Sequence, residues 1–183
     1  MQNIYFIRHG ESEANQKHIC AGHTDVELTA LGIQQAKQAG LELQDSGLHI
    51  DLLISSPLRR ALNTAKEIAK IINYPEDKIV IRKEAIERYR GNFEGKPTSL
   101  QHGVSDDQYI AAGAESEAQM KQRAIQLLEF AKSRTEDNIL IVSHNQFGRS
   151  VVAYTTGKER SGIERLPNAH IIKIVPSSAI VTP

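Results

Sequence analysis

Short apolar runs rich in β-branched residues recur along the chain, and polar segments separate them. Most of these runs show little alternation between apolar and polar positions, which is typical of strands buried on both faces of a parallel sheet. The runs lie at Ile4–Ile7, Asp51–Ile54, Lys78–Ile81, Asn138–Val142 and Ala169–Val175.

Three of the intervening segments carry apolar residues at helical spacing behind a recognisable helix start. Thr29 is placed to cap a helix that runs to about Asp45. The pair Ser56–Pro57 resembles an N-cap followed by a first helical residue, and Ser116 with Gln119 forms a capping box. Strands that alternate with helices predict a three-layer α/β/α sandwich with a mostly parallel central sheet.

No internal repeat, low-complexity segment or linker divides the chain, so we expect residues 1–183 to form a single domain. The segment at about 91–113 differs from the rest, because it is polar, punctuated by glycine and weakly periodic. That composition predicts a surface excursion or a small lid.

Charge and composition narrow the class of protein. The 22 basic residues balance the 22 acidic ones, so the global positive field on which nucleic-acid or membrane-surface binding relies is absent. Cys20 is the only cysteine, which excludes an internal disulfide and fits a reducing compartment. No run is long enough to cross a bilayer, and no basic leader precedes the first one. We therefore expect a cytoplasmic protein that binds neither nucleic acid nor membranes; its oligomeric state is not predicted.

Residues able to bind an anion follow three of the predicted strands. Arg8 and His9 come after the first strand, Arg60 comes soon after the second, and His144 comes after the fourth. Because the carboxyl ends of parallel strands meet at one edge of a sheet, we expect these side chains to lie close together. Two histidines with at least two arginines suit an anion with several oxygens, and phosphate is the natural ligand.

Other chemistries find less support in the sequence. The seven histidines show no compact zinc-ligand spacing, and His18 and His23 are more typical of solvent-facing loop residues. No nucleotide-binding P-loop motif occurs. A cysteine phosphatase loop needs an arginine six places after the cysteine, but Val26 stands there after Cys20. We therefore expect no metal and no cofactor.

Ordered motifs run through nearly the whole chain, and together they resemble those of the histidine phosphatase superfamily, the phosphoglycerate mutase-like proteins. They are Arg8–Ser12 with Asn15 (R-H-G-E-S), Gly22–Ala36 (G-x-x-D-x-x-L-T-x-x-G-x-x-Q-A), Ser55–Ala61 with Thr64 and Ala65, Glu87–Gly95 (E-x-x-x-G-x-F-E-G), Glu115–Ser116 with Arg123, and Val142–His144. One such motif alone would be a weak signal, whereas the ordered set is specific.

The resemblance implies a phosphatase of the histidine acid type that acts on a small phosphorylated substrate. His9 would be the nucleophile that becomes a phosphohistidine, and Arg8, Arg60 and His144 would clamp the phosphoryl oxygens. Glu87 would protonate the leaving alkoxide and then activate water. The further substrate-binding candidates are Asn15, Thr24, Asn145 and Gln146.

These roles set requirements on protonation. His9 must be neutral at one nitrogen to attack, whereas His144 is more useful as a donor, in its charged form or as the neutral ring. Glu87 must hold a proton near neutral pH, so we expect burial to raise its pKa, while nearby arginines act in the opposite direction.

Departures from the family pattern leave the substrate open. The family commonly has Gly-Gly after the second histidine, where this chain has Asn145 and Gln146, and Ile19 stands where many members carry a substrate-binding arginine. A cofactor-dependent phosphoglycerate mutase is the enzymatic alternative, although the known mutases have a larger lid. A non-catalytic phosphate-binding protein is the alternative from another class.

Overall fold

A five-stranded sheet forms the centre of the computed structural model, which describes residues 2–174. The strand order is β3-β2-β4-β1-β5. All neighbours pair in parallel except β5, which runs antiparallel to β1. The strands are β1 (Asn3–Arg8), β2 (Leu52–Ser55), β3 (Val80–Ile81), β4 (Asn138–Ser143) and β5 (Ile171–Ile174). The predicted mostly parallel sheet is therefore confirmed.

Each predicted strand segment contains a strand, and the differences lie at the ends. Lys78 belongs to a 3-10 turn, η1 (Glu76–Lys78), so the edge strand β3 is shorter than expected. The antiparallel last strand begins at Ile171 rather than at Ala169, which has a positive φ of 51°. Val175, the predicted end of that strand, lies outside the described residues.

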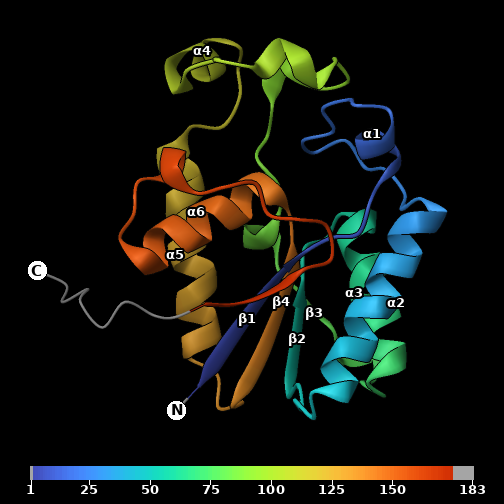
Figure 1. Cartoon of the computed structure of the whole chain (residues 1–183). Helices are drawn as coiled ribbons and strands as arrows, with labels where there is room; N and C mark the ends of the chain where they lie inside the picture. The colour runs from blue at the N-terminus through green and yellow to red at the C-terminus, as the bar shows by residue number, and fades with distance from the viewer. Residues whose placement is uncertain (1, 175–183) are drawn as a thin grey trace, which may run out of the picture.

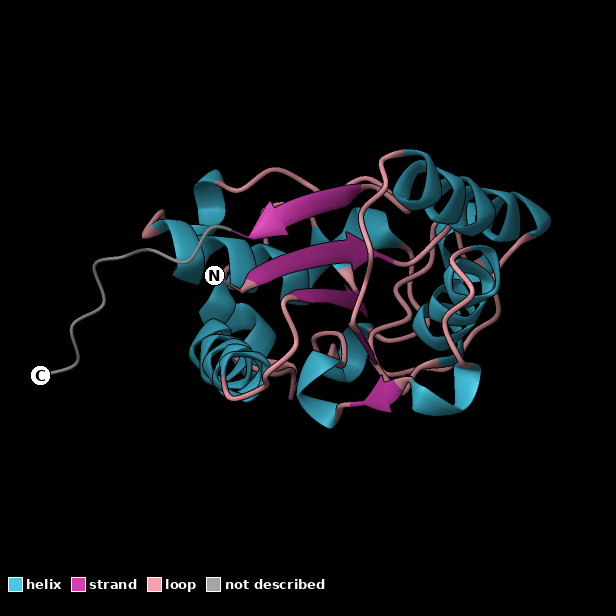
Figure 2. Cartoon of the chain, turned by 90° about the horizontal axis from the view of Figure 1, so that it is seen from below, coloured by secondary structure: helices cyan, strands magenta, loops and turns pink. Residues whose placement is uncertain are grey.

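Helices cover both faces of the sheet, as Figures 1 and 2 show from two directions. On one face, α2 (Ala30–Asp45) and α3 (Arg59–Ile71) pack against Ile7 of β1; on the other, α5 (Glu117–Lys132) and α6 (Asn145–Thr156) pack against Phe6. Successive strand residues point to opposite faces, so a run that is apolar at every position supplies two cores. The three-layer sandwich is confirmed.

The predicted helix starts at Thr29 and Ser116 are confirmed. The Thr29 hydroxyl accepts a hydrogen bond from the Gly32 backbone N–H at 3.0 Å, and α2 ends at Asp45. Ser116 and Gln119 form the reciprocal capping box of α5. Both caps satisfy N–H groups that have no partner inside the helix.

The predicted start at Ser56 is wrong. The helix α3 begins at Arg59, and its N-cap residue Leu58 makes no side-chain cap. The Ser56 hydroxyl lies 2.7 Å from Nε2 of His144 on a neighbouring segment. The same hydroxyl also accepts from the Leu58 N–H at 3.3 Å, so it serves both a local turn before the helix and a tertiary contact.

The segment at 91–113 folds into three short helical turns near the carboxyl ends of the strands, at the top of Figure 1. These are η3 (Gly91–Phe93), η4 (Thr98–Gln101) and α4 (Asp106–Ala111). Backbone hydrogen bonds tie the segment to the loop after α1 (Glu13–Gln16): Cys20 N–H donates to the Lys96 carbonyl at 2.9 Å, and Thr98 N–H donates to His18 at the same distance.

Candidate active site

A cavity of about 350 Å³ opens at the carboxyl edge of the sheet. Seven of the nine predicted site residues line it: Arg8, His9, Asn15, Arg60, Glu87, Asn145 and Gln146. His144 lies directly behind them, with its ring centroid 5.1 Å from that of His9. Thr24 is exposed and does not line the cavity, so its predicted direct contact with substrate finds no geometric support.

His9 follows β1, and its ring is held in one tautomer. Nδ1 lies 2.6 Å from the carbonyl oxygen of Gly10. Because a carbonyl only accepts, Nδ1 carries the proton and Nε2 keeps its lone pair. Burial, and then the charges of Arg60 and Arg8, hold the pKa of His9 well below 6.5. His9 is therefore a neutral nucleophile at physiological pH.

Close backbone packing fixes the turn that carries His9. A Cβ atom on Gly10 would lie 2.3 Å from the carbonyl oxygen of Gly32, so no larger residue fits without moving the backbone. The Gly10 N–H donates to the Thr64 hydroxyl of α3 at 3.0 Å. The start of α2 and the middle of α3 thus position the nucleophile.

Arg8 is buried beside the cavity and is held by neutral acceptors. Its Nη1 donates to the Leu166 carbonyl at 2.9 Å, and its Nη2 donates to Oδ1 of Asn15 at 3.3 Å. Burial and the nearby charge of Arg165 lower the pKa of Arg8 to about 10. Arg8 therefore keeps its positive charge at neutral pH, and it makes no ion pair within residues 2–174, although the nearby charge of Glu87 favours its protonated form.

Arg60, in the first turn of α3, is fixed in the same way. It donates to the carbonyl oxygens of Gly22 at 2.7 Å and Thr24 at 2.9 Å. Burial lowers the pKa of Arg60 as well. Thr24 therefore acts on the site through its backbone. The neighbouring Arg59 instead forms an ion pair with Asp25 at the surface and does not line the cavity.

Glu87 accepts three backbone hydrogen bonds, from the N–H groups of Arg88 at 2.8 Å, Phe147 at 3.0 Å and Gln146 at 3.1 Å. Burial raises the pKa of Glu87, but the charge of Arg90 and these three donors outweigh it, so the pKa lies below 4.5. Burial and the arginine charge thus act in the expected opposite directions, and the net shift of the Glu87 pKa, which the sequence left open, is downward in the free protein. Two of the donors belong to the first turn of α6, whose dipole also favours a carboxylate.

His144 is fully buried between β4 and α6. The pKa of His144 lies well below 6.5, because burial and the charge of Arg60 disfavour its protonated form. Nε2 contacts the Ser56 hydroxyl, and Nδ1 has no hydrogen-bond partner among residues 2–174. The neutral ring, rather than a charged donor, is the state that this environment favours.

The sequence analysis missed several residues in and around the site, among them His23 and Arg90. The half-buried ring of His23 lies with Nε2 2.8 Å from the Glu87 carbonyl oxygen, so that nitrogen carries the proton and His23 is not simply solvent-facing. Arg90 is 8% exposed and lines the cavity. The sequence motifs indicated no role for either residue, because the contacts of their side chains form only in the folded chain.

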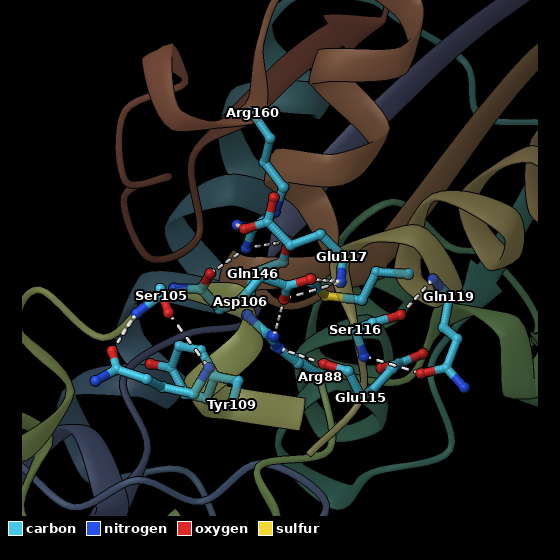
Figure 3. Close-up of polar contacts among 12 residues, drawn as sticks. Arg88, Ser105, Asp106, Tyr109, Glu115, Ser116, Glu117, Gln119, Gln146 and Arg160 are labelled. Carbon is cyan, nitrogen blue, oxygen red and sulfur yellow. Dashed lines mark hydrogen bonds and ion pairs between the residues drawn. The ribbon is translucent and has the colours of Figure 1, made fainter. Parts of the chain in front are cut away.

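Gln146, which stands where the family commonly has glycine, joins a network that reaches the lid segment (Figure 3). Its side-chain oxygen accepts from Arg160, whose other nitrogen pairs with Glu117 at the start of α5. Asp106 of α4 accepts from the Glu117 N–H at 3.1 Å and pairs with Arg88 at 2.5 Å. Because this chain has Gln146 in place of glycine, a series of contacts through Arg160 and Glu117 connects α6 to α4.

Residues 2–174 contain no group of three or more His, Cys, Asp and Glu side chains placed to hold a metal ion. Over the same residues, no helix is long and apolar enough to span a membrane. Metal independence stays a prediction, because it needs an activity measurement in a chelator.

The comparisons with known proteins agree with this geometry. The family model of the histidine phosphatase superfamily (branch 1) matches residues 4–179. The chain therefore belongs to the histidine phosphatase superfamily. The histidine acid type is the label of a different subfamily, so the match supports phosphatase activity in general and not that finer label.

Individual relatives favour phosphatases over mutases. A Hydrogenobacter thermophilus protein named as a candidate phosphoserine phosphatase 2 is 30% identical over 93% of this chain and 85% of its own length. The structure of an Entamoeba histolytica phosphoserine phosphatase with 3-phosphoglyceric acid matches with a TM-score of 0.75 and 26% identity, over 94% of this chain and 90% of that one. A bisphosphoglycerate-dependent mutase of Glaesserella parasuis is 38% identical, but over only 55% of this chain and 45% of the mutase.

Proposed function

We propose that this protein hydrolyses small phosphate monoesters through a phosphohistidine on Nε2 of His9. The observation that carries the proposal is the state of His9: a neutral ring, oriented by the Gly10 carbonyl, in a cavity lined by the buried cations Arg8 and Arg60. A neutral nucleophile beside fixed positive charge is what attack on a phosphoryl group requires.

In the first step, Nε2 of His9 attacks phosphorus and the bond to the ester oxygen breaks. Arg8 and Arg60 balance the charge spread over the phosphoryl oxygens. The leaving oxygen takes a proton from Glu87, which is ionised in the free protein. We infer that Glu87 is protonated when the dianionic phosphoryl group enters, because a second negative charge raises the pKa of a nearby carboxyl.

In the second step, water attacks the phosphohistidine and the bond from phosphorus to Nε2 breaks. The Glu87 carboxylate takes one proton of that water, which returns Glu87 to the protonated form that began the first step. When inorganic phosphate leaves, Glu87 releases the proton to solvent and the free site is restored. The three backbone donors hold the carboxylate in one place for both steps.

The remaining assignments belong to the same proposal. We assign residues 1–183 to one domain in which the segment at about 91–113 covers the cavity as a small lid, a role that the lining residues Thr98, Gln101 and Tyr109 support. A cytoplasmic location fits the single buried thiol of Cys20.

Release of phosphate from p-nitrophenyl phosphate in EDTA tests the proposal. We expect turnover without added metal, and a loss of at least about 10³-fold in His9→Ala. His49→Ala is the matched control, because His49 is exposed and outside the cavity. Trapping in acid and alkali should show an acid-labile, alkali-stable phosphoryl group on the wild-type chain alone.

The other two functions predict different results. Bisphosphate-dependent interconversion of 2- and 3-phosphoglycerate would show a mutase. Tight phosphate binding with no turnover of any ester would show a binding protein. Full activity in His9→Ala would overturn the proposed nucleophile.

A further inference from the structure

The arginines of this chain divide into two sets by their partners. The six that do not line the cavity each form an ion pair with a carboxylate; they are Arg59, Arg82, Arg88, Arg123, Arg134 and Arg160. The other five line the cavity, and none has an ion-pair partner within residues 2–174; they are Arg8, Arg60, Arg90, Arg149 and Arg165. The arginines that lack an ion-pair partner are therefore concentrated at the cavity, although the chain as a whole has no net charge.

The charge of the cavity exceeds what one phosphoryl group needs. Glu87 is the single carboxylate among the lining residues, and His9 is neutral. With Glu87 protonated in the bound state, a phosphoryl dianion balances two arginines and leaves three. Arg8, Arg60 and Arg90 are buried, Arg149 is partly buried and Arg165 is exposed. A buried cation without a counter-charge is costly, so the excess at Arg90 indicates a second anion in the bound state.

Arg90 is the strongest member of the unpaired set outside the phosphate clamp. It is 8% exposed, and its guanidinium lies 5.3 Å from the ring centroid of Tyr109. Arg88 stacks on the same ring at 4.1 Å and is also buried, but it pairs with Asp106. Arg88 thus has an ion-pair partner, whereas Arg90 has none within residues 2–174 and acts on Glu87 only through its charge.

The lid segment places an unused donor beside Tyr109. The Tyr109 hydroxyl donates to Oε1 of Gln101 at 3.1 Å, which fixes the amide of Gln101. Its Nε2 is buried, has no hydrogen-bond partner within residues 2–174, and belongs to a residue that lines the cavity. Arg90 and Gln101 thus offer a cation and an amide N–H from one wall of the site.

We propose that the substrate carries a second anionic group, a carboxylate or a further phosphate, which binds Arg90 and the amide of Gln101 while its phosphoryl group faces His9. The proposal rests on the proposed phosphatase function and adds a substrate class to it. The cavity volume of about 350 Å³ suits a compact metabolite. Ile19 stands where many relatives have a substrate-binding arginine, and Arg90 supplies a cation from another segment.

A pair of esters that differ in one group tests the proposal. 3-Phosphoglycerate carries a carboxylate where glycerol 3-phosphate carries a hydroxymethyl group. We expect the wild-type kcat/KM to favour 3-phosphoglycerate by about tenfold or more, as for one charge-assisted contact. Fructose 1,6-bisphosphate against fructose 6-phosphate tests a second phosphate in the same way, and the pair with the larger preference identifies the anion.

Variants assign the preference to Arg90. Arg90→Gln should reduce the ratio to about threefold or less, Arg90→Lys should keep most of it, and Gln101→Leu should reduce it in part. Arg134→Gln is the matched control, because Arg134 is exposed and pairs with Glu136 outside the cavity. The ratio is the readout because Arg90 also lowers the pKa of Glu87, and that effect is common to both esters.

Failure of this inference and failure of the proposed function give different results. Hydrolysis of both members of each pair at equal kcat/KM, or an unchanged preference in Arg90→Gln, overturns the second-anion site alone. If no ester is hydrolysed, the phosphatase proposal fails, and calorimetric binding of 3-phosphoglycerate and glycerol 3-phosphate to the His9→Ala chain still decides the inference. Equal affinities there overturn it, and a preference that Arg90→Gln removes supports it.

Discussion

The two walls of the cavity are built in different ways. The phosphate side comes from the ends of β1 and β4 and the start of α3, where backbone groups hold His9, Arg60 and Glu87. The lid side comes from short turns that are held by backbone hydrogen bonds to the loop after α1 and also by side-chain contacts, such as the ion pair of Arg88 with Asp106. Backbone positions change little between sequences of one fold, whereas side-chain contacts change with each substitution. The phosphate side therefore carries the reaction that the family shares, and the lid side determines which substrate binds.

Replacing the acid on the phosphate side should have the largest effect. Glu87→Gln keeps one acceptor oxygen, for the N–H groups of Arg88 and Phe147. It turns an NH₂ group toward the Gln146 N–H and loses proton transfer, so kcat should fall about 10² to 10⁴-fold. The loss should be smaller for p-nitrophenyl phosphate, whose leaving group needs less protonation. A variant as active as wild type on an alkyl phosphate would remove Glu87 from the mechanism.

The phosphate side should also tolerate no added bulk. In Gly10→Ala the new Cβ would lie 2.3 Å from the Gly32 carbonyl oxygen, so we expect a loss of about 2 kcal/mol or more in the free energy of unfolding. Urea denaturation measures it. Gly162→Ala is the control, because no atom lies within 4 Å of a Cβ there; equal losses in both variants would contradict the steric account.

Removing an anchor of the lid should affect stability and substrate choice more than chemistry. Asp106→Ala leaves the buried Arg88 without its partner, which should cost about 1 to 3 kcal/mol of unfolding free energy. We expect kcat for p-nitrophenyl phosphate to stay within about tenfold of wild type. Asp107→Ala, its exposed neighbour on α4, should change neither quantity. A collapse of kcat in Asp106→Ala alone would show that the two walls are not separable.

Acid should weaken the phosphate side through Glu87. Its pKa is lowered in the folded protein, so its stabilising contribution is complete above the unfolded value near 4.5 and is lost as the pH falls through the folded value. The difference in unfolding free energy between the wild type and Glu87→Gln should therefore shrink from pH 7 to pH 3.5. A difference that grows over this range would contradict the lowered pKa.

Gln146 serves both walls, and its substitution should have the smallest effect. Its backbone N–H donates to Glu87, while its side chain accepts from Arg160. Gln146→Ala keeps the first contact, so kcat should stay within about threefold, and stability should fall by about 1 kcal/mol. A much larger loss of kcat would mean that the side chain, and not only the backbone, positions Glu87.

The elements that periodicity predicts are those whose stability comes from their own apolar pattern and caps. The strand segments, the caps at Thr29 and Ser116 and the alternation that predicts three layers are all properties of neighbouring residues. The predicted start at Ser56 was wrong: its hydroxyl accepts from the Leu58 N–H and contacts the distant His144, and the helix begins only at Arg59. A local sequence pattern predicts a helix start, but it does not show the contacts that a residue distant in sequence will make.

The order of motifs was enough to identify the superfamily and most of the residues around the phosphate. Most of these residues belong to motifs that follow a strand, and the fold brings the ends of those strands together. Protonation and specificity needed the folded chain. The pKa of Glu87 depends on donors from α6 and on Arg90, and the charge excess depends on which arginines lack a carboxylate. Electrostatic energies depend on distances through space, and those distances exist only once the segments have packed.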